Sequence, residues 1–304
     1  MDLSVVVVSW NTRELLRDCL WSVYDTVSGL QFEVVVVDNG SSDGSAEMVA
    51  NEFPQAVLLR NEANRGFAAA NNQAILKSSG HYVLLLNPDT EARPGALATL
   101  VSFLDEHPEA GAAGSLLLDP GGGTQLSCSP MPTLSRELWR LLHLDQLWPY
   151  ASYPMRTWPR QTPREVDVAQ GACLILRREA LAQAGYLDED YFIYTEEVDL
   201  CHRVRGRGWK VYWVPTAEVV HYGGRSTRQV AGPMFLWLYR SKVLFFRKRR
   251  GRLAAWVYKA VLLLAAIPRL AASPLARLER PPRCYEHAAL ARGYWELVKA
   301  LPTL

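Results

Sequence analysis

The chain has 304 residues, 49% of them hydrophobic and 21% charged, and this composition excludes disordered, collagen-like and disulfide-scaffold proteins. Its net charge of +2 is unevenly distributed. Residues 240–304 carry 14 Lys and Arg against 3 Asp and Glu, a net charge of +11, which leaves a net charge of −9 for residues 1–239. Five cysteines without a C-x-x-C pair, and a start without a secretory signal pattern, predict reduced thiols in a protein that faces the cytosol.

Apolar runs too short for helices alternate with amphipathic stretches along the first part of the chain. Runs that are apolar on both faces are typical of central parallel strands. This alternation predicts a doubly wound α/β sheet flanked by helices, whose ligands bind beyond the carboxyl ends of the strands. The expected strands are 5–8, 34–37, 57–59, 82–86 and 112–118, and the helices between them begin near residues 12, 43, 66 and 94.

The pattern breaks between Asp119 and Pro163, where three successive glycines precede a stretch rich in Trp and Pro. We expect an irregular segment there, forming a wall over a site. Periodicity returns at 166–176, and helices near 178–184 and 196–205 and a strand through 211–214 follow.

The polar residues that follow the apolar runs form a recurring set. No P-loop and no G-x-G-x-x-G follows the first run, which disfavours a P-loop NTPase and a dinucleotide dehydrogenase. In order and separation, the set resembles the inverting, GT-A-fold family 2 glycosyltransferases, in the branch of bacterial rhamnosyltransferases and galactofuranosyltransferases. The resemblance covers roughly residues 1–250 and implies a GT-A-type doubly wound mixed sheet. The set is Ser9-Trp10-Asn11, Asp38-Asn39-Gly40, Asn64-Arg65-Gly66, Asn87-Pro88-Asp89, Glu196-Glu197-Val198-Asp199 and His221.

The first three motifs are the nucleotide side of the implied site. Asp38 would accept the imide N–H of a uracil or thymine, next to Ser9, Trp10 and Asn11 on the neighbouring strand. Arg65 and Gly66 open a helix whose N–H groups and guanidinium would meet phosphate or ribose. Simpler interpretations stay open: Asp-Asn-Gly is a preferred turn sequence, Arg65 could be an ordinary surface residue, and Asp43 is expected to cap a helix.

Asn87-Pro88-Asp89 occupies the D-x-D position of the family, whose carboxylates bring a divalent cation to the sugar-nucleotide diphosphate. The resemblance makes Asp89 the primary ligand of Mg²⁺ or Mn²⁺ and leaves Asn87 as a neutral ligand at best. His221 matches a family histidine that completes the metal site or contacts the diphosphate, although a lone histidine after a strand can also be structural.

The acidic motif resembles the start of the family's E-D-x-D helix, whose second acid is the general base. By position this base is Glu197, with Glu196 as the alternative, because a base must lie within about 2.6–3.2 Å of its proton. Asp199 is expected to pair with Arg203 four residues on. Gly171 and Ala172 resemble the family's acceptor-side strand.

The resemblance implies an inverting, metal-dependent transferase that moves a sugar, rhamnose or another deoxyhexose being favoured, from a dTDP- or UDP-sugar to a lipid-linked or polysaccharide acceptor. One alternative is a sugar-phosphate nucleotidyltransferase, which usually has a glycine-rich basic loop after its first strand. The other alternative is a non-catalytic nucleotide-sugar-binding module. It is suggested by Asn87 and Glu197, which differ from the aspartates of the family's D-x-D and E-D-x-D motifs.

We predict a catalytic domain over residues 1–230 and a helical extension over 231–304. Leu253–Ile267 is apolar except for Lys259, but 15 residues fall short of the ~20 that span a bilayer. We therefore predict a helix in the interface of the cytoplasmic leaflet, so that the protein is peripheral and drawn to anionic lipid. A packed hairpin or a homo-oligomer interface is the alternative, and nucleic acid is disfavoured because apolar runs have no role against phosphate.

Overall fold

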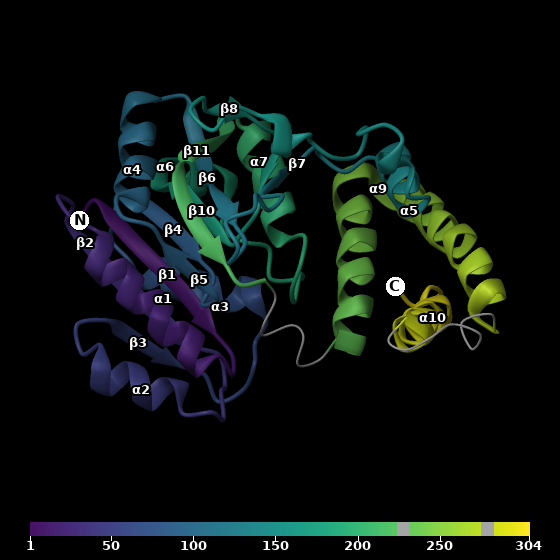
Figure 1. Ribbon diagram of the computed structural model, residues 1–304, viewed down its shortest axis with the longest axis horizontal. Coiled ribbons are helices and arrows are strands. Elements are labelled where there is room, and N and C mark those ends of the chain that lie inside the picture. The colour runs from purple at the N-terminus through teal and green to yellow at the C-terminus, as the bar shows by residue number, and fades with distance from the viewer. Residues whose placement is uncertain (224–230, 275–282) are drawn as a thin grey trace. The chain divides into compact units, whose positions relative to one another are not determined.

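The computed structural model describes residues 1–223, 231–274 and 283–304. The chain forms two compact units (Figure 1). The first contains Met1–Met131, Tyr153–Phe192 and Glu196–Gln229, and the second contains Pro132–Ser152, Ile193–Thr195 and Val230–Leu304.

A mixed sheet forms the centre of the first unit. Its main order is β3-β2-β1-β4-β10-β6-β11-β5, and β8 pairs with β11. The strands are β1 (Leu3–Ser9), β2 (Phe32–Asp38), β3 (Val57–Arg60), β4 (Tyr82–Leu86), β5 (Thr90–Ala92), β6 (Ala110–Leu118), β8 (Arg164–Glu165), β10 (Cys173–Arg177) and β11 (Lys210–His221). Two further short strands, β7 (Cys128–Ser129) and β9 (Val168–Ala169), pair with each other.

The apolar runs form the central strands because both faces of the sheet are covered. β1 runs parallel to β2 and β4, with Ser9 opposite Asp38 and Val7 opposite Leu86, so their carboxyl ends lie side by side. β10 runs antiparallel to β4, which places Cys173 opposite Leu86 and brings the start of β10 to that same edge. The predicted mixed, doubly wound sheet is confirmed.

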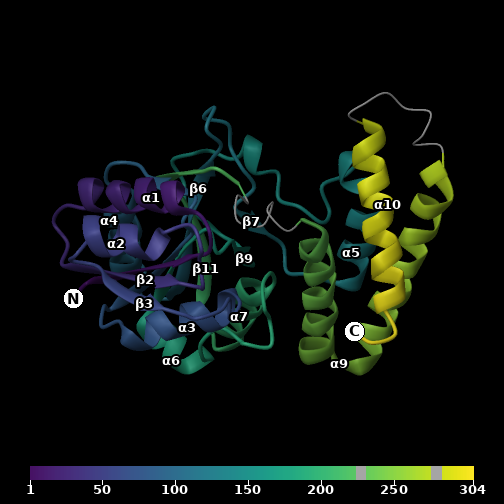
Figure 2. The same ribbon diagram turned by 90° about the horizontal axis from the view of Figure 1, so that it is seen from below.

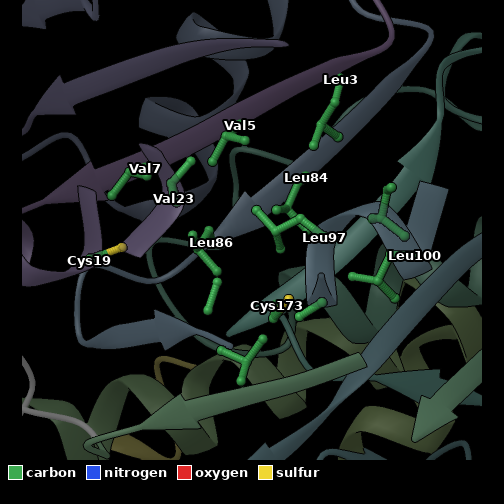
Figure 3. Packing of buried hydrophobic residues seen from close by; sticks show 14 of the residues in the cluster. Leu3, Val5, Val7, Cys19, Val23, Leu84, Leu86, Leu97, Leu100 and Cys173 are labelled. Carbon is green, nitrogen blue, oxygen red and sulfur yellow. The ribbon is translucent and has the colours of Figure 1, made fainter. Parts of the chain in front are cut away.

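Helices cover the two faces of this sheet. Figure 2 shows α1, α2 and α4 on one side and α3, α6 and α7 on the other. Figure 3 shows the packing under the first group, where Val23, Leu97 and Leu100 meet alternate residues of β1 and β4. The helices are α1 (Arg13–Thr26), α2 (Ser45–Glu52), α3 (Phe67–Lys77), α4 (Ala96–Glu106), α6 (Arg178–Ala184) and α7 (Glu196–Gly206).

Several predicted elements differ from the structure. The N-cap of α2 is Gly44 in a left-handed conformation, not Asp43, whose carboxylate instead accepts a hydrogen bond from Ser45 N at 3.0 Å. The run at 166–176 is divided into β9 and β10, and β11 continues to His221, well past residue 214. The expected irregular segment contains a helix, α5 (Leu134–Leu141), which belongs to the second unit.

The second unit is helical, as predicted for the C-terminal extension. It contains α5, α9 (Ala231–Ala272) and α10 (Arg283–Ala300), and both α5 and α10 pack on α9. α9 consists of two helical halves, because Gly251 has φ 87° and ψ 171°. Among the described residues, one helical stretch, Met234–Ala272, is long and apolar enough to cross a membrane by length and composition, although 39% of its most apolar window is buried within the protein.

Candidate functional site

The loops after β1 and β2 are joined by hydrogen bonds. Asn11, which has a positive φ of 51°, donates its N–H to Ser41 Oγ at 3.0 Å, and its Oδ1 accepts from Ser42 N at 2.8 Å. Ser9 Oγ lies 3.0 Å from Thr12 Oγ1, and Trp10 is half-buried beside them. The first two predicted motifs therefore form one connected loop surface.

Asp38, at the carboxyl end of β2, has one carboxylate oxygen without a hydrogen-bond partner among the described residues. The residue is only 4% exposed, and its Oδ2 accepts a hydrogen bond from Ser41 N at 3.2 Å. Its Oδ1 is buried, and within the described part of the chain it has no hydrogen-bond partner. A buried acceptor left unpaired costs about 1–3 kcal/mol, so this oxygen is suited to an N–H that arrives with a ligand.

Asn39 fixes the third motif, a role that the sequence analysis did not assign to it. Its Nδ2 donates to Asn64 Oδ1 at 3.0 Å and to Gly66 O at 3.2 Å, while its Oδ1 accepts from Arg65 N at 3.0 Å and from Asn61 Nδ2 at 3.0 Å. The backbone of Arg65 is thus held rigidly, whereas its side chain is exposed. The signal in the sequence that could have indicated this contact is the pair Asn39 and Asn64, one in each loop, because short amide side chains readily form hydrogen bonds with loop backbone.

Gly66 must be a glycine at the start of α3. Its φ is +86°, and an added Cβ would lie 2.6 Å from Phe192 O. Phe67 N, the next amide, donates to the same Phe192 O. The segment before α7 and the N-terminus of α3 are therefore in direct contact.

Asp89 and His221 meet at the far end of the same edge. β5 pairs with β11 so that Thr90 lies opposite His221, and Tyr222 N donates to Asp89 O at 2.9 Å. This pairing brings Asp89 Oδ1 to 3.4 Å from His221 Nε2. Asp89 is 4% exposed, and Asn87 N is bonded to Ala172 O at 2.9 Å.

Gln125 determines which nitrogen of His221 carries the proton. Gln125 Nε2 donates to the backbone carbonyl of His221 at 2.7 Å, and this orients the amide so that its Oε1 faces His221 Nδ1 at 3.0 Å. Since a carbonyl oxygen only accepts, Nδ1 carries the hydrogen, and in the neutral ring Nε2 presents a lone pair toward Asp89.

A carboxylate oxygen and an imidazole lone pair that face each other have the chemistry of two ligands for one divalent cation, with the histidine oriented by its outer partner. Within the described residues no group of three His, Cys, Asp or Glu side chains gathers. Such a cation would therefore take its remaining ligands from substrate phosphates and water, as Mg²⁺ commonly does. The donor set at this point of the site fits the predicted metal.

Two acids begin α7, and they differ in access. Glu196 is 5% exposed, and burial, followed by the adjacent charge of Glu197, raises the pKa of its carboxyl well above the usual range. Glu197 is only half-buried. Its Cβ lies 3.6 Å from the position that a Cβ would take at Gly171, which places Glu197 beside the turn before β10, where the sequence predicted the acceptor-side strand.

Asp199, the third acid of the motif, has a structural role, as predicted. Its Oδ2 accepts from Arg203 Nε at 2.8 Å and its Oδ1 from Tyr191 Oη at 3.3 Å. The Arg203 guanidinium also bonds the carbonyls of Gly185 and Tyr186, so this ion pair joins α6 to α7.

The profile that describes glycosyl transferase family 2 matches residues 4–185, more than half of the chain. The chain belongs to glycosyl transferase family 2. It is 34% identical over 265 residues to the N-acetylglucosaminyl-diphospho-decaprenol L-rhamnosyltransferase of Mycobacterium tuberculosis, which covers 82% of this chain and 85% of that protein. It is 23% identical over 200 residues to the rhamnosyltransferase WbbL of Escherichia coli, covering 61% of this chain and 71% of that one.

Solved glycosyltransferases confirm the GT-A fold of this family 2 chain. A mannosyltransferase of Pyrobaculum calidifontis, solved with GDP-Man and Mn²⁺, matches 99% of this chain and 84% of its own with a TM-score of 0.58 at 20% identity. A GalNAc transferase solved with UDP, GalNAc and Mn²⁺ matches 82% of this chain and 50% of its own with a TM-score of 0.57 at 17% identity. The chain is thus a glycosyltransferase by family, and it has the GT-A fold.

Proposed function

We propose that this family 2 glycosyltransferase is inverting and metal-dependent, and that it moves rhamnose from a dTDP- or UDP-sugar to a lipid-linked or polysaccharide acceptor. The observation that carries the proposal is the position of Glu197, beside Gly171 on the edge of the sheet that also holds the Asp89–His221 pair. The choice of rhamnose rests on the Mycobacterium tuberculosis and Escherichia coli relatives, and the lipid-linked acceptor on the former.

The nucleotide would bind across the carboxyl ends of β1 and β2. Asp38 Oδ1, buried without a partner among the described residues, would accept the imide N–H of a pyrimidine base, while the Asn11 loop borders the base. The exposed side chain of Arg65, on its fixed backbone, would reach a phosphate or the ribose.

Asp89 and His221 would hold Mg²⁺ or Mn²⁺, with Asn87 as a neutral ligand at best, and the cation would stabilise negative charge on the departing diphosphate. The Mn²⁺ bound in the two solved relatives supports this part of the proposal. Gln125 would keep His221 Nδ1 protonated, so that Nε2 remains available as a ligand.

Glu197 would accept the proton of the acceptor hydroxyl as the acceptor oxygen attacks the anomeric carbon. The bond from that carbon to the diphosphate oxygen breaks, and its electron pair leaves with the diphosphate. One displacement from the opposite face inverts the anomeric centre and needs no covalent enzyme intermediate. Glu196 is less suited to this role because it is almost completely buried, and because its raised pKa means that it holds its proton more tightly than an ordinary glutamate.

We further propose that transfer takes place at the cytoplasmic face of the cell membrane, with the protein bound peripherally through its second unit. A lipid-linked acceptor lies in the membrane, so an enzyme held at the surface meets it without extracting it. The long apolar helix α9 and the net charge of +11 over residues 240–304 support this placement.

A radiolabelled transfer assay tests the proposal. The purified chain is incubated with dTDP-rhamnose or UDP-rhamnose, a polyprenyl-diphosphate-linked acceptor and Mn²⁺ or Mg²⁺. We expect labelled lipid from the wild type, none in excess chelator and none from Asp89→Ala, whereas Asn87→Asp should preserve or tighten metal binding. Donor binding without transfer to any acceptor would contradict the proposal and favour a nucleotide-sugar-binding module.

A further inference from the structure

The second half of α9 has an apolar face that no other part of the described structure covers. Leu264 is 64% exposed and Leu253 77% exposed. The exposed positions fall on one side of the helix, in an arc of about 120°, because their spacing follows the helical period of 3.6 residues. This outer face consists of Leu253, Trp256, Val257, Leu263, Leu264 and Ile267.

The opposite side of the same helix is packed inside the second unit. Tyr258, Leu262 and Ala266 are completely buried there, and Tyr258 packs on Phe246 with ring centroids 4.7 Å apart. A soluble helix normally exposes polar side chains opposite its packed face. Here both sides are apolar, which marks the outer face as an interaction surface.

Charged groups lie directly behind the packed side. Tyr258 Oη donates to Glu137 Oε2 at 3.1 Å, and the same carboxylate binds Lys242 at 2.8 Å and Arg140 at 2.7 Å. Glu137 is 0% exposed. If α9 crossed a bilayer with its packed partners, this ionic cluster would enter the hydrocarbon region, where charged side chains are strongly disfavoured.

Basic side chains stand next to the outer face. Arg247, Lys248, Arg250 and Arg252 are exposed around the Gly251 break and immediately precede Leu253. Lys259 lies over the Trp256 ring, with its Nζ 4.8 Å from the centroid, which suits a lysine whose stem follows an apolar surface while its charge stays near water. An apolar face flanked by this cluster complements anionic headgroups above acyl chains.

We propose that the outer face of α9 lies in the interface of an anionic lipid bilayer, with the helix axis in the membrane plane. This inference builds on the membrane placement in the proposed function and specifies the face and orientation. It requires no turnover, so vesicles without acceptor or donor test it separately from sugar transfer.

The first test measures flotation of the full-length chain with vesicles of neutral lipid alone or of neutral lipid mixed with anionic lipid. We expect binding to the anionic vesicles that weakens as salt rises, because surface charges are screened within ~8–10 Å at 0.1–0.15 M ionic strength. Leu264→Glu with Ile267→Glu should reduce binding at least tenfold. Leu76→Glu, at a leucine equally exposed on α3, is the matched control and should bind like the wild type.

The second test separates an in-plane helix from a spanning one. Nitroxide labels on Leu253→Cys and on Ile267→Cys report depth in the bilayer by spin relaxation, with the identically treated wild type as background. An in-plane helix places both labels at similar shallow depths. Depths that differ by ~20 Å, the length of the intervening helix, would show a spanning helix and overturn the proposal.

Two other outcomes would also overturn it. The first is a wild type that ignores anionic vesicles at low salt. The second is a chain that is dimeric without lipid and becomes monomeric on Leu264→Glu with Ile267→Glu, because the outer face would then belong to a second copy.

Discussion

Glu197 and Glu196 are neighbours with different surroundings, and this difference gives the first prediction. Glu197→Gln keeps the shape but removes the base, so kcat should fall by ~10²-fold or more while the Kd of the donor stays unchanged. Glu196→Gln should retain most activity, because glutamine resembles the protonated acid that burial favours at that position. Single-turnover transfer and donor titration on both variants measure this. The reverse pattern would assign the base to Glu196.

Asp38 gives a prediction on nucleotide choice. Asp38→Ala removes the unpaired buried oxygen that would receive the base, so the Kd for thymidine and uridine diphosphates should rise by ~10-fold or more. The wild type should bind guanosine diphosphate poorly. Calorimetry on the three nucleotides checks both statements. Equal affinity for guanosine and uridine diphosphates would refute pyrimidine recognition by Asp38.

Gln125 gives a prediction on the metal that does not depend on turnover. Gln125→Ala frees His221 to rotate and to change tautomer, so Mn²⁺ affinity in the presence of a nucleoside diphosphate should fall by ~10–100-fold. Mn²⁺ binding is followed by electron paramagnetic resonance. Gln183→Ala, at a surface glutamine on α6 that bonds Trp209, is the control. Unchanged Mn²⁺ affinity in Gln125→Ala would show that the orientation of His221 is irrelevant to the metal.

At the scale of elements, the sequence predicted best where one local signal was sufficient. The bounds of β4 and α6 are those predicted, because a run of buried apolar residues and a short amphipathic stretch each end at a clear boundary. β5 was missed because it has three residues, and only pairing with β11 turns them into a strand that brings Asp89 to His221. α5 was missed because Lys242 and Tyr258, which bind its buried Glu137 and hold the helix on α9, are more than a hundred positions away in the chain.

In the candidate site too, the sequence predicted the features that have a local signal and missed those that depend on distant contacts. The motifs after β1, β2 and β4 could be located because parallel strands bring their carboxyl ends to one edge. The roles of Asn39 and Gln125 could not be predicted, since they depend on residues 22 to 96 positions away that the sequence pattern alone does not bring together.

Glu137 gives a prediction on the stability of the second unit. Glu137→Ala leaves Lys242, whose side chain is only 15% exposed, without its counter-charge, so the free energy of unfolding should fall by about 3–5 kcal/mol. Glu137→Leu combined with Lys242→Met should recover most of this loss, because no charge is then buried. Hydrogen exchange of α5 and α9 amides measures the effect. Lys299→Ala breaks only an exposed ion pair with Glu296 and is the control.

The same cluster has a defined pH dependence. Burial alone would raise the pKa of Glu137, but Lys242 and Arg140 outweigh burial and hold this pKa below its ordinary value of 4.5. The stabilisation is therefore complete above about pH 4.5 and is lost as pH falls through the lowered pKa. Wild-type stability that is flat through this acid range would contradict the ionised cluster.

At the scale of the whole molecule, the proposed account assigns one task to each of the two units. The first unit is a GT-A sheet in which the motif residues reach one edge, and the second is a helical unit that includes the basic part of the chain. In the proposed account, the sheet performs transfer and the helices hold it at the lipid that carries the acceptor.

The anomeric configuration of the product tests this account most directly. The wild type is given dTDP-rhamnose labelled with carbon-13 at the anomeric carbon, Mn²⁺ and a lipid-linked acceptor, and the product is examined by nuclear magnetic resonance. We predict one glycosidic product whose anomeric configuration is opposite to that of the donor, formed at least ~10²-fold more slowly by Glu197→Gln. A product with the donor's configuration, or a Glu197→Gln variant as fast as the wild type, would contradict the proposed single displacement with Glu197 as its base.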